Sequence, residues 1–122
     1  MDSEEVNITI TEGAAKVYRN SEGKLHRLDG PAVEFEDGGE AWWKNGKRHR
    51  VGGPAVSYGI GYREWRYEGL LHRVDGPAVI YSGGEKEWVI NDIVYATKED
   101  WFDALSDEAK EKCLFSEDFL NA

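Results

Sequence analysis

The sequence predicts a mainly β protein, an antiparallel sheet of stacked β-hairpin repeats with a short C-terminal α-helical cap. A 23-residue pattern occurs three times, in units 26–48, 49–71 and 72–94. Eight of its 23 columns are identical in all three units: His, Arg, Gly, Pro, Ala, Val, Gly and Trp. Residues 97–122 lose this pattern and take on helical spacing. Repetition at a fixed period is typical of stacked architectures, so the repeat decides the fold class.

Length and composition indicate a single compact domain. The chain has 122 residues, 40% of them apolar and 12% aromatic, which is enough to bury a core and unlike a disordered acidic tail. The lone cysteine, Cys113, leaves no intramolecular disulfide and gives no sign of an oxidising compartment. Because no apolar run approaches the roughly 20 residues of a membrane span and the first residues are acidic, we expect a cytoplasmic protein that does not bind membranes.

The first strand is expected near the N-terminus. Residues 6–11 alternate and are rich in β-branched side chains, a pattern typical of strands. Ile10 lies one period before Val33, which indicates a partial N-terminal unit. The repeat body is therefore predicted to span residues 1–96, with the partial unit followed by the three complete ones.

Each complete unit begins with a strand whose side chains alternate between two faces. In the first unit Pro31, Val33 and Phe35 fall on one face. Ala32 and Glu34 fall on the other, which is the period-two pattern of a half-buried strand. The Gly-Pro step suits a strand entry, because proline lacks a donor and is tolerated at the first position of a strand.

A turn and a return strand complete the predicted hairpin. A glycine that can supply the positive φ of a tight turn recurs in every unit, at Gly38, Gly61 and Gly84. The return strand carries a tryptophan in constant phase with the valine of the first strand, at Trp42, Trp65 and Trp88. We expect stacked hairpins to bury the valines, the aromatic residues of the first strands and these tryptophans in a continuous core stripe.

Residues 97–122 are predicted to form the helical cap. Thr97 precedes acidic residues as a helix N-cap does, with Trp101 and Leu105 at helical spacing after it. Ser106 begins a second helix that runs through Cys113, and a short turn follows near residue 119. Stacked repeats need covers for their exposed edges, so a cap is favoured over an independent functional domain.

The segment Trp42 to His49, Trp-Trp-Lys-Asn-Gly-Lys-Arg-His, resembles the MORN repeat. The likeness covers residues 14–95 and is greatest to a subtype with the pattern His-Arg-x-Asp-Gly-Pro-Ala, which is associated with small proteins of bacteriophages and large viruses. The resemblance implies an elongated or curled sheet of hairpins used for protein association. Lipid binding, proposed for some MORN proteins, transfers poorly, because arginine replaces the glycine after histidine at Arg27, Arg50 and Arg73.

Three histidines in one column, His26, His49 and His72, invite comparison with a metal site. Neighbouring strands lie about 4.8 Å apart, so equivalent residues of successive hairpins should be roughly 10 Å apart. Ligands of one zinc ion must lie about 2 Å from the metal. The histidines therefore form a ladder, and we expect each ring to bond a backbone group of its own turn and to pack beside the next tryptophan.

The arginine and aspartate columns have a local explanation. Arg27 and Asp29, like Arg73 and Asp75, lie two residues apart and can pair beside the turn, whereas the second unit has Gly52 in place of aspartate. A catalytic carboxylate column without its middle member would be unusual. No candidate nucleophile has a neighbouring base, and no Gly-rich phosphate loop follows a strand. We therefore predict no catalytic, metal or cofactor-binding residues, and a protein that is not an enzyme.

Residues that break the repeat are candidates for a partner-specific surface. Aromatic residues and arginine are enriched at binding hot spots, and four of them depart from the pattern: Trp43, Tyr62, Arg66 and Tyr67. Ordinary partial exposure is the alternative, because surface aromatics are common. Stacking of single-stranded bases on these rings is a further alternative, which the local charge does not favour.

The negative charge is concentrated at the two ends of the chain. The net charge is −9, yet residues 13–95 hold twelve basic and twelve acidic side chains. Residues 96–122 hold eight acids and three lysines. Four of these acids are candidates for contact with a basic site on a partner: Asp100, Asp103, Asp107 and Glu108. Opposite charge would speed such association, and the alternative is that the acids only solubilise the protein.

These features predict a non-enzymatic protein-binding module. The resemblance to phage and viral repeat proteins implies an inhibitor or modulator of a host defence protein, acting in the host cytoplasm. One alternative is a self-associating structural protein, paired as a homodimer through its sheet edge or its helical cap. Another is an acidic mimic that occupies a nucleic-acid-binding site on its partner, while direct nucleic-acid binding is disfavoured by the net charge.

Overall fold

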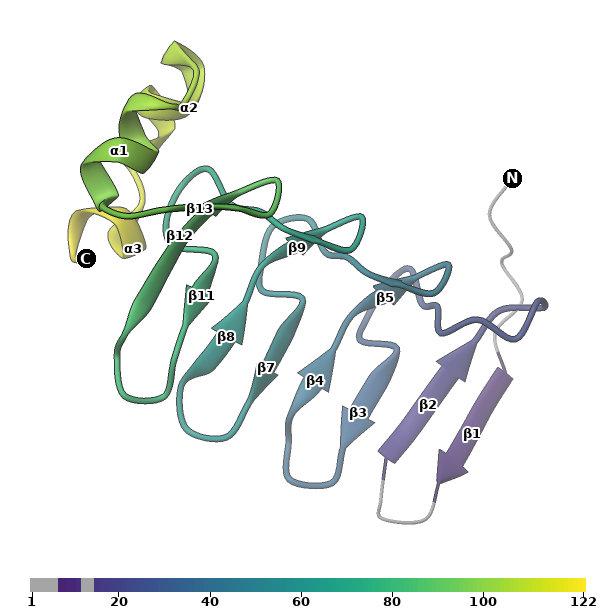
Figure 1. The fold of residues 1–122 in the computed structure, drawn as a ribbon. Coiled ribbons are helices and arrows are strands. Elements are labelled where there is room, and N and C mark those ends of the chain that lie inside the picture. Colours follow the sequence, from purple (N-terminus) through teal and green to yellow (C-terminus); the bar gives the residue numbers. More distant parts are fainter. Residues whose placement is uncertain (1–6, 12–14) are drawn as a thin grey trace.

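Long hairpins from successive repeats pair side by side into one antiparallel sheet (Figure 1). The computed structural model describes residues 7–11 and 15–122, and over these ranges the sheet has nine strands in the order β1-β2-β3-β4-β7-β8-β11-β12-β13. They are β1 (Asn7–Thr11), β2 (Ala15–Arg19), β3 (Val33–Phe35), β4 (Glu40–Ala41), β7 (Val56–Tyr58), β8 (Tyr62–Glu64), β11 (Val79–Ile80), β12 (Lys86–Ile90) and β13 (Ile93–Tyr95). The predicted fold of stacked antiparallel hairpins is confirmed.

The first hairpin belongs to the partial N-terminal unit. β1 pairs with β2, and Val17 of β2 pairs with Val33 of β3. The second strand of this hairpin therefore pairs with the first strand of the next unit, as β4 pairs with β7. The expected strand start at Val6 lies outside the described residues, as do residues 1–5 and 12–14 of the predicted repeat body.

Valine side chains form a buried row on one face of the sheet. Residues directly opposite one another in neighbouring strands point to the same face, and the register aligns Val17, Val33, Ala41 and Val56 in consecutive strands. All four are buried in one hydrophobic cluster, against which Trp43 packs. The predicted period-two pattern thus holds for the valine column.

The opposite face of the sheet is also buried beside the valine row, although a strand with one exposed face was expected. Ala32, Ala55 and Ala78 have no exposed surface. The backbone N–H of Trp42 donates to the Ala55 carbonyl at 2.6 Å, so these two residues lie opposite each other. A small side chain in the alanine column leaves room for the aromatic ring of the preceding unit.

The units also contain a second, shorter hairpin that the sequence did not single out. It is formed by β5 (Trp43–Lys44) with β6 (Lys47–Arg48), by β9 (Arg66–Tyr67) with β10 (Leu70–Leu71), and by the end of β12 with β13. In the first of these turns Asn45 has φ 49° and Gly46 has φ 83°, as a type I′ turn requires. The signal for this hairpin was the Asn-Gly pair itself.

The three repeat tryptophans are not equally buried, which corrects the expected core stripe. Trp88 lies in the core beneath the helices, whereas Trp42 and Trp65 are half-buried. The difference follows from position in the stack. Only the last unit is covered by helices, while each inner tryptophan ring is covered by an arginine of the next unit.

Three short helices form the predicted cap at the C-terminal end of the sheet (Figure 1). They are α1 (Lys98–Asp103), α2 (Asp107–Cys113) and α3 (Glu117–Leu120). Thr97, Ser106 and Ser116 are their N-caps, and each hydroxyl accepts a hydrogen bond from a backbone N–H in the first turn. Trp101 is fully buried, with its ring centre 4.7 Å from that of Trp88. The helical cap therefore shares its core with the last repeat.

Candidate partner-binding surfaces

A stacked arginine links each unit to the one before it. The guanidinium carbon lies over an aromatic ring: Arg27 over Tyr18 at 4.1 Å, Arg50 over Trp42 at 3.9 Å, and Arg73 over Trp65 at 3.8 Å. Each arginine also donates to the carbonyl of the proline four residues later, at 3.1–3.2 Å. A Cβ on the glycine three residues after each arginine would come within 2.7–2.8 Å of the guanidinium carbon. These glycines are Gly30, Gly53 and Gly76. The arginine, glycine and aromatic columns therefore form one interaction.

Ion pairing at this column differs between units. The pairing expected in the first and third units is present, with Arg27 to Asp29 at 3.4 Å and Arg73 to Asp75 at 2.8 Å. Arg73 Nη2 also donates to Asp118 Oδ2 of α3 at 2.9 Å, which joins the helical cap to the last repeat. Arg50, close to Gly52, has no carboxylate partner among the described residues.

The histidine column holds the second hairpins in place. Each ring Nδ1 accepts a hydrogen bond from a backbone N–H 19 residues later: His26 from Asn45 at 2.9 Å, His49 from Glu68 at 2.9 Å, and His72 from Asn91 at 3.1 Å. The bond reaches the turn of the second hairpin instead of the loop that carries the histidine, which corrects that expectation. The expected neighbour of each ring is a tryptophan, and the ring of His49 also lies 4.7 Å from that of Tyr67.

Burial disfavours the charged form of two of these rings. It lowers the pKa of His72, and it lowers the pKa of His49 despite the opposing effect of the Glu68 carboxylate. A neutral ring can accept at Nδ1, as the backbone hydrogen bonds require. Within residues 7–11 and 15–122, no three His, Cys, Asp or Glu side chains are grouped so that they could hold a metal ion.

Three of the four irregular candidates gather around one buried carboxylate, Glu64. Tyr62 Oη donates to Oε2 at 2.6 Å, Arg66 Nε donates to Oε1, and Arg48 Nη1 lies 3.2 Å from Oε1. Trp43 lies under the Arg48 guanidinium, 5.4 Å from its ring centre. Burial would raise the pKa of Glu64, but the hydrogen bonds it accepts and the two guanidiniums lower it overall. This group connects the short hairpins to the sheet.

Tyr67 lies apart from the Glu64 group. Its ring is exposed and stands between His49 and His72, at 4.7 and 6.4 Å. A second set of aromatic residues recurs two positions after the valine of each unit: Phe35, Tyr58 and Tyr81. They were expected in the core stripe, but all three are exposed, which corrects that expectation. Their 23-residue spacing was the available signal.

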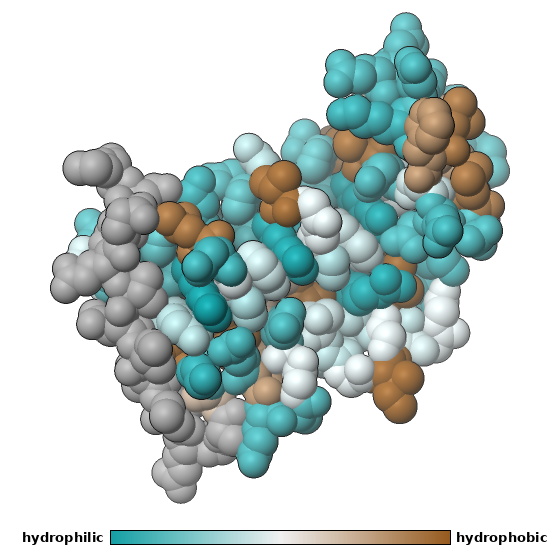
Figure 2. Space-filling view, turned by 180° about the vertical axis from the view of Figure 1, so that it is seen from behind, coloured by the Kyte–Doolittle hydropathy of each residue, from teal (hydrophilic) through white to brown (hydrophobic). Residues whose placement is uncertain are grey.

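All four acidic candidates lie on the exposed surface of the helical cap. Asp100 and Asp103 belong to α1, and Asp107 and Glu108 form the first turn of α2. Large apolar side chains are exposed on the same cap: Leu114 at 61%, Phe115 at 85% and Leu120 at 55%. Figure 2 shows apolar side chains gathered at this end among hydrophilic ones. The cap thus combines negative charge with uncovered apolar surface.

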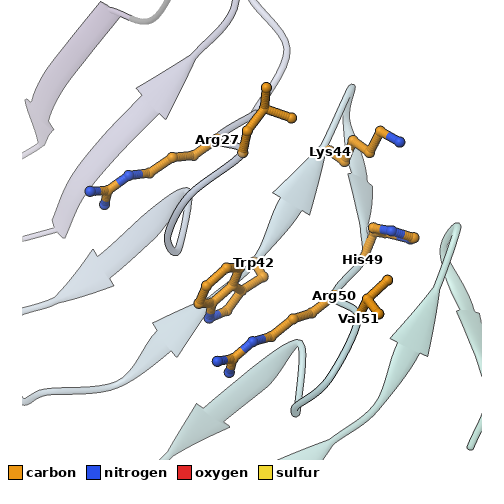
Figure 3. A pocket seen from close by; sticks show the side chains of 7 residues that line it. Arg27, Trp42, Lys44, His49, Arg50 and Val51 are labelled. Carbon is orange, nitrogen blue, oxygen red and sulfur yellow. The ribbon is translucent and has the colours of Figure 1, made fainter. Parts of the chain in front are cut away.

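A pocket of about 250 Å³ lies between the arginine loops of the first two units. Its lining includes Arg27, Trp42, Lys44, His49 and Arg50, and none of the residues described around it is acidic. Figure 3 shows the two arginine side chains extending in the same direction, with Trp42 between them. The lining combines several columns of two units, so spacing along the chain did not predict it.

Comparison with known protein families, with curated proteins and with solved structures gives no match for this chain. In the part of the chain that the structure describes, no helix has the length and apolar character needed to cross a bilayer.

Proposed function

We propose that this chain is a non-enzymatic protein-binding module that contacts its partner through the helical cap. The observation that carries the proposal is the exposure of Leu114, Phe115 and Leu120 on that cap. Large apolar side chains grouped on a surface and bordered by polar residues are typical of protein interaction sites, and an aromatic anchor such as Phe115 is a common hot spot.

The charge of the cap indicates the chemistry of the partner. Residues 96–122 hold eight acids and three lysines, and the four acidic candidates are all exposed. Acids around an apolar centre favour a partner with a basic rim, because complementary charge steers encounter and disfavours wrong partners. A host protein with a basic site fits this description.

The repeat body supports a binding role more than a catalytic one. Four groups of the body whose pKa is shifted are hydrogen-bonded within the scaffold: Glu64 and Tyr62 to each other, and His49 and His72 to backbone turns. A scaffold of this kind would present a surface without turning over a substrate. With the resemblance to phage and viral repeat proteins, this extends the proposal to a stoichiometric inhibitor or modulator.

Surface substitutions test the proposal better than truncation, because removing the cap would expose Trp88. The experiment captures proteins from host lysate on immobilised wild type and on a Leu114→Ser, Phe115→Ser double variant. The matched control is Ile60→Ser, which removes a 90% exposed apolar side chain from a long-hairpin turn. We expect one protein to be retained by wild type and control and lost from the double variant; equal retention by all three would reject the proposal.

The charge contribution is tested with the captured partner. Changing Asp100, Asp103 and Asp107 to Asn and Glu108 to Gln should weaken binding and flatten its dependence on salt, because fewer charges are neutralised across the interface. Circular dichroism of the variant controls for loss of helix. Unchanged affinity and salt dependence would show that only the apolar side chains contribute.

Self-association is the second candidate, and strand β13 favours it. β13 is an edge strand of the described sheet, and its Ile93 and Val94 are both 59% exposed. An exposed apolar edge can pair with another copy. Sedimentation velocity over a wide concentration range should then show a dimer that Val94→Lys abolishes, whereas a strict monomer at high concentration excludes this role.

A further inference from the structure

The second unit lacks a charge partner that the other two units have. Its aspartate column holds Gly52, and the described contacts of Arg50 are the Pro54 carbonyl, 3.1 Å from Nη1, and the Trp42 ring. These contacts leave the Nε–H and Nη2 donors of Arg50 without an acceptor among the described residues. A guanidinium stacked on a ring and held by one carbonyl is already oriented, so little further ordering is needed for it to bind an anion.

The third unit shows what such an arginine binds in this scaffold. Arg73 has the same ring and proline contacts, and two carboxylates occupy its remaining donors. Nε donates to Asp75 of its own loop at 2.8 Å, and Nη2 donates to Asp118 of α3 at 2.9 Å. The second carboxylate comes from a separate acidic segment that docks on the loop. Arg50 presents the same donors without either acid.

The pocket beside Arg50 is lined by basic side chains, of which Arg27 also pairs with Asp29 and Glu34 outside the lining. Arg50 lines the pocket between the first two arginine loops together with Arg27 and Lys44, and no acid lines it (Figure 3). The lining differs between steps of the stack. One unit later Tyr67 occupies the column of Lys44, and its ring lies against His49.

We propose that this pocket binds a carboxylate side chain from an acidic segment of a protein partner, with Arg50 as the main ligand. The planar fork of a guanidinium matches a carboxylate in two parallel hydrogen bonds. The inference deepens the proposed function and rests on it, adding a basic contact on the repeat body to the acidic contact of the cap. A carboxylate is favoured over a phosphate because Arg73 binds two carboxylates in the equivalent position.

The probe is an acetylated, amidated hexaglutamate peptide, titrated calorimetrically into the full chain. In parallel, the arginine Nε–H signals are followed by NMR, and the Arg50 signal should shift. Gly52→Asp supplies the carboxylate that the other units have. A Cβ there meets no atom within 4 Å, but Gly52 has φ 89°, which strains any side chain, so circular dichroism checks that this variant folds. This variant, like Arg50→Gln, should weaken peptide binding at least tenfold. The matched control, Lys86→Gln, removes one positive charge outside the pocket and should stay within twofold of wild type.

Several results would overturn the inference. They are the absence of saturable peptide binding, equal weakening by Lys86→Gln, or tighter binding of inorganic phosphate or a thymidine hexanucleotide at the same ionic strength. If Arg50→Gln does not fold, Arg50→Lys decides, because it keeps the positive charge and removes the guanidinium fork; unchanged peptide affinity of this variant would also overturn the inference. If wild type does not bind the peptide but still captures the partner of the cap, this site alone is rejected. The cap variants test the proposed function separately.

Discussion

Arg50, Gly53 and Trp42 show how three columns of the repeat depend on one another. The guanidinium lies between the indole ring and the glycine, where a Cβ would come within 2.8 Å of its carbon. A cation–π contact contributes about 0.5–1 kcal/mol when exposed and about 2 kcal/mol when desolvated. Any side chain at position 53 would move the guanidinium, so these columns can change only together.

Glu64 is a buried residue whose single replacement should destabilise the repeat body. Glu64→Gln removes the charge that pairs with Arg48 and Arg66, which should lower the free energy of unfolding at pH 7 by about 2–3 kcal/mol. Because the folded protein lowers the pKa of Glu64, its contribution is complete above its ordinary value of 4.5 and is lost as the pH falls through the folded value.

Urea denaturation from pH 7 to pH 3 measures this effect. The difference between wild type and Glu64→Gln should shrink below pH 4.5. The exposed Glu85→Gln variant is the control and should stay within about 0.5 kcal/mol of wild type. A difference that is constant over the whole pH range would mean that the Glu64 charge does not stabilise the fold.

At the scale of elements, each unit consists of two hairpins with different constraints. The long hairpins build the sheet by pairing with their neighbours. The short hairpins have two central residues with positive φ and are held by a histidine ring from 19 residues earlier. The short turns must therefore adopt positive φ and at the same time place a backbone N–H within reach of the histidine ring.

Two substitutions in the short turns should have opposite effects. Gly46→Ala places a side chain at φ 83° and should lower the free energy of unfolding by about 1–2 kcal/mol. Glu68→Asn creates the favoured Asn-Gly pair at φ 50° and should raise it by about 0.5 kcal/mol. Chemical denaturation at pH 7 measures both, and effects of the same sign would contradict this account of the turns.

At the scale of the whole molecule, the stack is ordered from neighbour to neighbour along one direction. Its ends differ, because the last unit is covered by a helical cap that contributes Trp101 to the core and Asp118 to Arg73. Stability in such repeats depends on the interfaces between adjacent units and on their end covers. The cap therefore has a structural side, facing Trp88, and an exposed side that carries Phe115.

Two aromatic substitutions in the cap should separate these sides. Trp101→Ala removes a fully buried ring and should lower the free energy of unfolding by about 3–5 kcal/mol. Phe115→Ala removes an exposed ring and should change it by at most about 0.5 kcal/mol while weakening partner capture. Thermal and urea unfolding measure the first effect; a large loss of stability for Phe115→Ala would assign that ring to the fold.

Much of the fold could be predicted because its signals act over short distances. The valine column followed from strand alternation, and the helix starts followed from Thr97 and Ser106. The candidate site was less predictable. Trp43, Tyr62 and Arg66 were identified as irregular, but their common partner Glu64 was not, because a carboxylate inside a strand gives no sign that two guanidiniums will cover it.

The sequence by itself determined a three-unit hairpin stack with a helical end and neutral body charge, because a fixed period, turn glycines and N-cap hydroxyls act within a few residues. Only the tertiary structure decided which charges meet. Stacking the units brought Arg48 to Glu64, docking of α3 brought Asp118 to Arg73, and the same stacking left Arg50 without an acid. These pairings depend on the distance between whole elements, which no spacing along the chain encodes.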